Sequence, residues 1–209
     1  MQIITKDISN ERFGIIKIND INFNYISENS SRKQFFDKEN HLVNHWTAGN
    51  RKALYDGYHF NITEINNQIY VFKSLKRKEK GQHLWSRNSG AIGNTMCCMA
   101  TKSDFPTQNM IEALSILNAE QCAWYGLEPE KEIILPKKQR IDYDSLITVN
   151  GSIKAPIISD HSYFAKKDGY SQERWDIGSY MDTVRKKSIQ YYKDLKSAKR
   201  EFLFKEIIK

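Results

Sequence analysis

The chain has 209 residues, of which 40% are hydrophobic and 27% are charged. This length and composition fit a globular chain with a real core and exclude an intrinsically disordered one. The formal net charge is +7, and residues 181–209 hold nine Lys and Arg against four Asp and Glu, or 9 − 4 = +5. Such a basic end indicates an anionic partner, although a solvated helix face has the same composition.

The sequence also bounds the cellular compartment. No apolar run approaches the roughly 18 residues that a membrane span needs. The first residues lack the basic start and apolar middle of a signal peptide, so we expect synthesis in the cytoplasm and retention there until another process releases the protein. Three cysteines, two of them adjacent, do not make a disulfide framework and suit a reducing compartment.

The first half of the chain is predicted to be mainly β-structure, because apolar residues alternate with polar ones and turn residues separate the runs. The predicted elements, in chain order, are a hairpin over 13–26, a polar loop over 28–40, a strand that ends near His45, a hairpin over 58–72 turning at Asn66 and Asn67, and a strand over 91–100.

The second half is predicted to contain two helices. Thr107 is a good N-cap, apolar residues follow it at helical spacing, and Gly126 supplies a stop. The remaining predictions are a strand-like stretch over 137–158 with a hairpin turn at Asn150-Gly151, an irregular polar segment over 159–178, and one long helix over 182–209. The predicted fold class is α/β, with a mixed central β-sheet flanked by helices, an N-terminal hairpin and a C-terminal helical extension.

Two of the five histidines occupy positions typical of ligands. His45 and His161 each end a predicted strand and open a loop, so they lie at the rim of a sheet, where ligand side chains commonly project. Asp176 closes the loop after His161. Two imidazoles and a carboxylate suit Zn²⁺ and leave a fourth position for water, although the spacing alone does not bring them together. His41 is predicted to lie on the surface, and His59 to be a buried structural histidine.

Five blocks of the sequence, in a fixed order, resemble one enzyme family. They are 45–49, 58–62, 81–93, 107–126 and 160–176. The first resembles a His-x-Thr opening, the third a Gly-x-His and Asn-x-x-Ile-Gly block, and the last a histidine followed by a basic-x-acidic triplet. The family is the zinc amidases of the peptidoglycan-recognition superfamily, the N-acetylmuramoyl-L-alanine amidases, in the form found in small phage endolysins.

The resemblance implies a role for each matching residue. His45, His161 and Asp176 would bind Zn²⁺, which lowers the pKa of a bound water towards about 7 and so prepares it to attack the amide. Tyr58 occupies the position of the active-site tyrosine, and Arg174 stands where the family usually has a lysine that faces the scissile carbonyl. Substrate contacts are expected from three further residues: His83, Trp85 and Asn88.

Two departures from the family pattern bear on the mechanism. Some members place a catalytic glutamate where this chain has Thr95, so the sequence favours the version of the site that depends on tyrosine. Arg174 keeps its charge at ordinary pH and therefore cannot act as a general acid, as a lysine can.

The resemblance predicts three parts: a hairpin and linker over 1–40 packed on the core, a zinc amidase domain over 41–180, and a basic helix over 181–209. The expected function is cleavage of peptidoglycan between N-acetylmuramic acid and L-alanine after release to the cell wall, as in a phage or prophage endolysin. The C-terminal helix is expected to meet an anionic envelope surface, and neither nucleic acid nor a protein partner is predicted.

Three alternatives stay open at this point. The first is a cytosolic amidase for recycled muropeptides, against which the missing glutamate at Thr95 counts modestly. The second is a peptidoglycan-binding protein without catalysis, although all three ligand positions are occupied here. The third, nucleic-acid binding, depends on net charge alone and predicts an affinity that falls steeply with salt.

Overall fold

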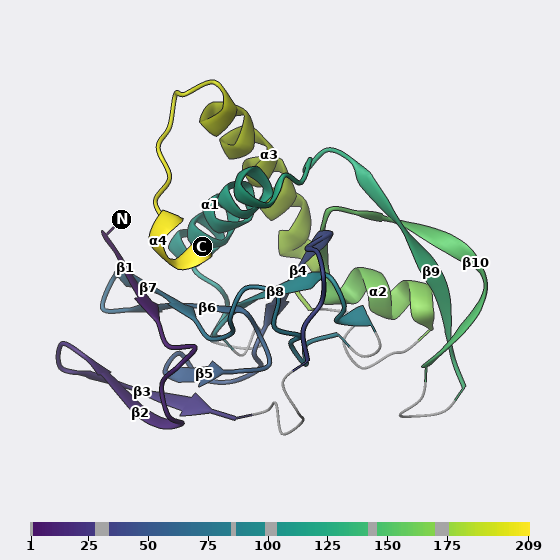
Figure 1. Cartoon of the computed structure of the whole chain (residues 1–209). Coiled ribbons are helices and arrows are strands. Elements are labelled where there is room, and N and C mark those ends of the chain that lie inside the picture. The colour runs from purple at the N-terminus through teal and green to yellow at the C-terminus, as the bar shows by residue number, and fades with distance from the viewer. Residues whose placement is uncertain (1, 28–33, 85–86, 99–103, 142–145, 170–175) are drawn as a thin grey trace.

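The structure is a computed structural model that describes residues 2–27, 34–84, 87–98, 104–141, 146–169 and 176–209. A mixed sheet of six strands forms its centre (Figure 1). The strand order is β1 (Gln2–Asp7), β7 (Gln68–Lys73), β6 (Phe60–Ile65), β8 (Ala91–Met96), β4 (His41–Trp46) and β11 (Ile158–Asp160). Strands β6, β8, β4 and β11 are parallel, so their carboxyl ends meet at one edge.

The alternation of side chains along the sheet separates two cores. On β7, Ile69 and Val71 belong to the larger core, which lies under the helices, whereas Tyr70 and Phe72 belong to a smaller core on the other face. A second sheet supplies the rest of the smaller core: β2 (Gly14–Ile18), β3 (Ile21–Ile26) and β5 (Ala53–Tyr55). The hairpins predicted over 13–26 and 58–72 are confirmed as β2–β3 and β6–β7.

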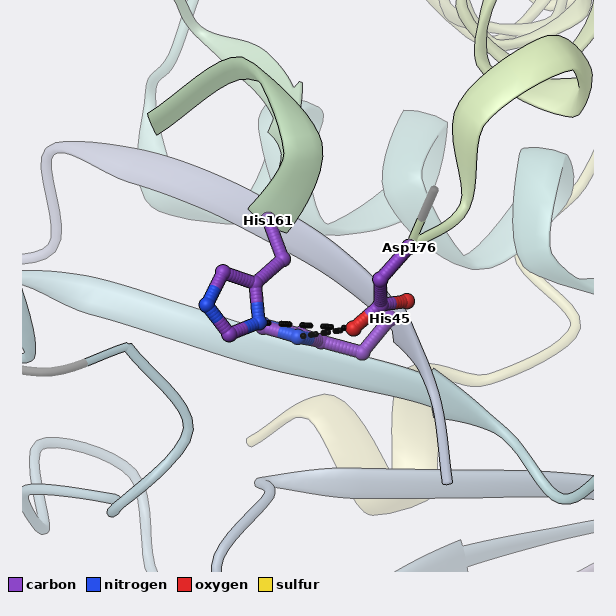
Figure 2. A group of neighbouring side chains, drawn as sticks. All are labelled: His45, His161 and Asp176. Atoms are coloured by element: carbon purple, nitrogen blue, oxygen red, sulfur yellow. Dashed lines mark hydrogen bonds and ion pairs between the residues drawn. The ribbon is translucent and has the colours of Figure 1, made fainter. Parts of the chain in front are cut away.

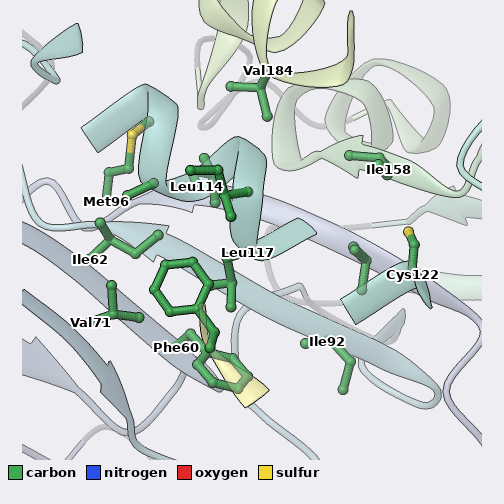
Figure 3. Close-up of a cluster of buried hydrophobic side chains, with 14 of the residues drawn as sticks. Phe60, Ile62, Val71, Ile92, Met96, Leu114, Leu117, Cys122, Ile158 and Val184 are labelled. Atoms are coloured by element: carbon green, nitrogen blue, oxygen red, sulfur yellow. The ribbon is translucent and has the colours of Figure 1, made fainter. Parts of the chain in front are cut away.

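The larger core is built around α1 (Gln108–Tyr125). Thr107 caps this helix by accepting a hydrogen bond from the Met110 amide, and Gly126 ends it in the left-handed conformation, as predicted. Figure 3 shows Leu114 and Leu117 of α1 above Phe60 and Ile62 of the sheet. Each such side chain contributes about 1.5–3 kcal/mol when it is fully buried, so this contact holds the helix layer on the sheet.

Two further helical elements cover α1. The helix α3 (Met181–Lys196) packs against it, and the short α4 (Lys205–Ile208) contacts both α1 and β1. The prediction of one helix over 182–209 was therefore wrong at its end. Glu120, a buried residue of α1, accepts hydrogen bonds from the amides of Leu203 and Phe204, and this docking turns the chain back onto the core.

A two-stranded ribbon lies beside the main sheet (Figure 1). It consists of β9 (Glu132–Arg140) and β10 (Leu146–Pro156), which pair antiparallel. The predicted turn at Asn150-Gly151 was wrong, because this dipeptide lies inside β10, where the register shifts between Thr148 and Ser152. Asn and Gly tolerate positive φ in a bulge as readily as in a hairpin turn, and Gly151 has a φ of 106°.

The predicted irregular segment over 159–178 contains regular structure. It begins with β11 and continues into α2 (His161–Asp168), which contacts β9 and β4. After residues 170–175, which lie outside the described residues, the chain forms the 3₁₀ turn η2 (Gly178–Tyr180). His41, expected on the surface, is only 1% exposed because it packs against Phe164 of α2. Among the described residues, no helix has the length and hydropathy needed to cross a membrane.

Candidate metal centre

His45, His161 and Asp176 meet at the carboxyl edge of the central sheet (Figure 2). The Oδ2 atom of Asp176 lies 3.2 Å from Nδ1 of His45 and 3.3 Å from Nδ1 of His161. The two imidazole rings are 5.0 Å apart, centre to centre. The structure therefore brings together side chains that are separated by up to 131 positions in the sequence.

Strand pairing explains why the two histidines are neighbours. His45 is the fifth residue of β4, and β11 pairs with β4 so that Asp160 lies opposite Asn44. The next residue, His161, therefore arrives at the same edge. Asp160 also caps α2 by accepting hydrogen bonds from the Tyr163 amide and the Ser162 hydroxyl, which fixes His161 as the first helical residue.

Asp176 is aimed at the histidines by a backbone contact. Its Oδ1 accepts a hydrogen bond of 2.6 Å from the Trp46 amide, which leaves Oδ2 facing the two imidazoles. Its own carbonyl accepts a hydrogen bond from the Ser162 amide. Asp176 is thus attached both to the end of β4 and to the start of α2, the two elements that carry the histidines.

These three residues fit a tetrahedral metal ion. Zn²⁺ binds imidazole nitrogen and carboxylate oxygen at roughly 2.0–2.2 Å, which places neighbouring ligand atoms about 3.3 Å apart in a tetrahedron. The two separations that involve Asp176 agree with that spacing, and one ligand atom from each of the three residues lies within 4.8 Å of the other two. The three side chains are buried, with 0%, 5% and 6% exposure for His45, His161 and Asp176. A buried carboxylate between two imidazoles is a donor set that a divalent cation neutralises.

The protonation states also suit a metal. Burial lowers the pKa of His45, although the neighbouring Asp176 carboxylate opposes this. Burial alone would raise the pKa of Asp176, but its hydrogen bonds to His161 and His45 hold that pKa below its usual value. Neutral imidazole and ionised carboxylate are the forms that bind metal ions.

His83 contacts His45 at the ring nitrogen that does not face Asp176. Nε2 of His45 lies 3.1 Å from Nδ1 of His83. If a metal ion occupies Nδ1 of His45, the ring proton lies on Nε2, which then donates a hydrogen bond to Nδ1 of His83 and stabilises the tautomer that a metal ligand needs. The ring of His83 fits against Gly81 and Gly93, since a Cβ atom at either glycine would approach it to 2.6 Å. The pattern Gly81-x-His83 was the sequence feature that marked this residue, but its contact with a ligand was not foreseen.

The other predicted site residues have these positions. The half-buried Tyr58 lies beside the cluster, with its ring 5.1 Å from the ring of His45 and stacked at 6.1 Å on that of His83. Asn88 accepts hydrogen bonds from the amides of His83 and Leu84, so it holds the loop that carries His83. Trp85 and Arg174 lie outside the described residues.

Thr95 lies next to the metal centre. It pairs with His45 in the register of β8 and β4, so the two side chains leave the same face of the sheet. Its hydroxyl oxygen is buried and has no hydrogen-bond partner among the described residues. Position 95, where some members of the amidase family that the sequence resembles place a glutamate, therefore holds a small polar group with unused hydrogen-bonding capacity.

No protein-family model matches the sequence, and no curated protein matches it. Two solved structures are similar to the chain. One is the Staphylococcus aureus hydrolase AmiA in complex with its ligand, with 12% identity, a TM-score of 0.49, and coverage of 85% of this chain and 86% of that one. The other is the N-acetylmuramoyl-L-alanine amidase LysC from Clostridium intestinale URNW, with 13% identity, a TM-score of 0.47, and coverage of 78% of this chain and 95% of that one. These likenesses are too distant to assign an activity, so the functional argument depends on the site.

Proposed function

We propose that this chain is a zinc-dependent N-acetylmuramoyl-L-alanine amidase that cleaves peptidoglycan. The observation that supports it most strongly is the convergence of His45, His161 and Asp176, which bring one ligand atom each to within 4.8 Å of the other two. The sequence motifs point to these same three residues. Three protein ligands leave a fourth position for water or substrate, which is typical of catalytic rather than structural zinc sites.

In the proposed mechanism, His45 and His161 bind Zn²⁺ through Nδ1 and Asp176 binds it through Oδ2. When bound, Zn²⁺ supplies an activated water and polarises the carbonyl of the amide between N-acetylmuramic acid and L-alanine. His83 keeps the proton of His45 on Nε2, so that the ligand nitrogen stays available. Asp160 keeps His161 at the start of α2 through its capping hydrogen bonds.

Tyr58 is the proposed group for proton and hydrogen-bond chemistry. Its ring borders His45, so its hydroxyl would orient the attacking water or pass a proton towards the departing amine of L-alanine. Arg174, which lies outside the described residues, is proposed to stabilise charge on the carbonyl oxygen, because its guanidinium stays positive at all working pH values.

We further propose that the enzyme serves lysis as a phage or prophage endolysin and meets anionic envelope polymers through exposed lysines of α3, such as Lys186 and Lys196. This proposal follows from the basic charge of residues 181–209. Reversing Lys186, Lys196 and Lys199 to glutamate is expected to weaken binding to purified walls while leaving cleavage of soluble fragments unchanged.

Digestion of purified peptidoglycan tests the activity. The expected products are free glycan chains and stem peptides that begin with L-alanine, identified by mass analysis and absent when a chelator is added. A parallel digestion of soluble anhydro-muropeptides separates a wall hydrolase from a recycling amidase. Intact peptidoglycan after incubation with zinc-loaded protein would contradict the proposal.

A further inference from the structure

Arg87 and Asp168 form an ion pair inside the protein, away from the three proposed metal ligands. The guanidinium donates two hydrogen bonds to the carboxylate, from Nε to Oδ2 at 2.5 Å and from Nη2 to Oδ1 at 2.6 Å. A third, from Nη1, reaches the carbonyl of Pro136 in β9 at 3.0 Å. The two side chains are only 4% and 1% exposed. The Arg87 guanidinium carbon also lies 5.4 Å from the ring centre of Phe164 in α2.

Such a pair is a costly way to stabilise a fold. Removing two charges from water costs several kcal/mol per ion, and well-packed apolar residues are often as stable. Asp168 is also the last residue of α2, where the helix dipole disfavours a carboxylate. The pair instead fixes geometry. A planar guanidinium that binds a carboxylate by two parallel hydrogen bonds sets both the distance and the relative orientation of the two segments that carry these side chains.

The two residues lie on the segments that carry the site. Asp168 ends the eight-residue helix whose first residue is His161. Arg87 belongs to the loop of His83, where its amide donates to the Leu84 carbonyl and Asn88 binds the amides of His83 and Leu84. His83 in turn holds His45. One ion pair therefore connects the residue that orients the first histidine to the helix that presents the second.

We propose that Arg87 and Asp168 are positioning residues that set the separation of His45 and His161 for metal binding. The inference rests on the proposed zinc site. The hydrogen bonds of the Arg87 guanidinium go to Asp168 and to the Pro136 carbonyl, so the pair acts on the ligands through α2 and the loop of His83. Loss of the pair would remove the hydrogen bonds that join the end of α2 to the loop of His83. Groups that hydrogen-bond directly to metal ligands are typically worth 10–100-fold in metal affinity, so a pair that acts through one further contact should have an effect at the lower end of that range.

The test is a double variant, Arg87→Met with Asp168→Leu, which replaces the pair with apolar side chains of similar size. Zinc affinity is measured by competition with a chromophoric chelator, and the unfolding temperature is measured without metal. We expect the zinc dissociation constant to rise about tenfold, with little change in the unfolding temperature. The visible spectrum of the Co²⁺-loaded protein should change in intensity, because it reports ligand geometry.

The matched control is Arg77→Met with Glu39→Leu. This pair also joins a guanidinium to a buried carboxylate, at 2.5 Å, but it links the segment before β4 to the segment after β7 and involves neither α2 nor the loop of His83. Its zinc affinity should stay within about twofold of the parent. A conservative variant, Arg87→Lys, should bind zinc more weakly than the parent protein, because a lysine cannot form the two parallel hydrogen bonds to Asp168.

The outcomes are distinguishable. If the parent protein binds no zinc, both the proposed metal site and the positioning role of the ion pair are overturned. If the parent binds zinc and the Arg87 and Asp168 double variant binds it equally well, only the inference is overturned. If the double variant does not fold, Asp168→Asn is measured in the same way, since it keeps the shape and removes the charge. Failure of both variants to fold would assign the pair to the stability of the fold and overturn the positioning role.

Discussion

Nε2 of His45 lies 3.1 Å from Nδ1 of His83, within hydrogen-bond distance, while the other ring nitrogen of His45 lies 3.2 Å from Oδ2 of Asp176. This contact predicts the effect of His83→Ala. The variant frees the His45 ring to rotate and to change tautomer, so zinc affinity should fall by about 10–100-fold. Competition with a chelator measures the change. Unchanged affinity in a folded variant would mean that His83 only fills space.

Tyr58→Phe separates proton chemistry from metal binding. The phenyl ring keeps the contacts with His45 and His83, whereas the hydroxyl is lost. We expect kcat to fall by about 10²–10⁴-fold, as for loss of a general acid or base, with zinc content unchanged. Steady-state cleavage of a muramyl-peptide substrate and metal analysis check both parts. A variant that retains parental kcat would remove Tyr58 from the mechanism.

His59 makes the stability of the metal-free protein sensitive to acid. Burial lowers its pKa to about 4, and its two ring nitrogens are bound to the Glu79 carbonyl and the Gly93 amide. Above pH 6.5 the histidine is neutral in both the folded and the unfolded chain, so it does not make the free energy of unfolding depend on pH. Between pH 6.5 and about 4 only the unfolded chain takes up the proton, so the free energy of unfolding falls by about 1.4 kcal/mol per pH unit.

Urea unfolding at several pH values, with chelator present, measures this dependence. The variant His59→Gln offers a donor and an acceptor without a titrating ring, so its stability should fall less steeply between pH 6.5 and about 4. Parallel curves for the parent and the variant would contradict the assignment. The buried His41, with a pKa lowered to about 3 by desolvation, acts in the same direction in both proteins and cancels in the comparison.

The C-terminal residues are predicted to be needed for folding, whatever else they do. Val184 of α3 and Phe204 just before α4 are fully buried in the larger core, and Glu120 binds the backbone at 203 and 204. Phe204→Ala should lower the free energy of unfolding by about 3–5 kcal/mol. Thermal unfolding measures it, with the half-exposed Leu203→Ala as the control expected to change stability far less. Equal effects of the two substitutions would contradict this docking.

Periodicity predicted most of the central sheet and α1, because buried strands and a capped helix with apolar residues at helical spacing leave local patterns. It failed at α2, whose first residues are polar and whose formation depends on the Asp160 cap and on burial of Phe164. It also failed at the end of α3, because the turn back onto α1 is decided by contact with Glu120, which is distant in the sequence.

The candidate site was predictable only in part, for the same reason. His45, His161 and Asp176 could be selected by residue type and strand-end position, and motif order strengthened the choice. The support from His83, and the link from Arg87 to Asp168, are contacts across 38 and 81 positions. Such contacts arise from tertiary packing, which leaves no local pattern in a single sequence.

The most direct test of the account is the zinc content of the purified protein and of a His161→Ala variant, measured by mass spectrometry of the metal after dialysis. The account predicts close to one equivalent of zinc in the parent chain and a small fraction of that in the variant, with both proteins folded. A parent chain that stays metal-free in the presence of zinc, or a variant that retains a full equivalent, would contradict it.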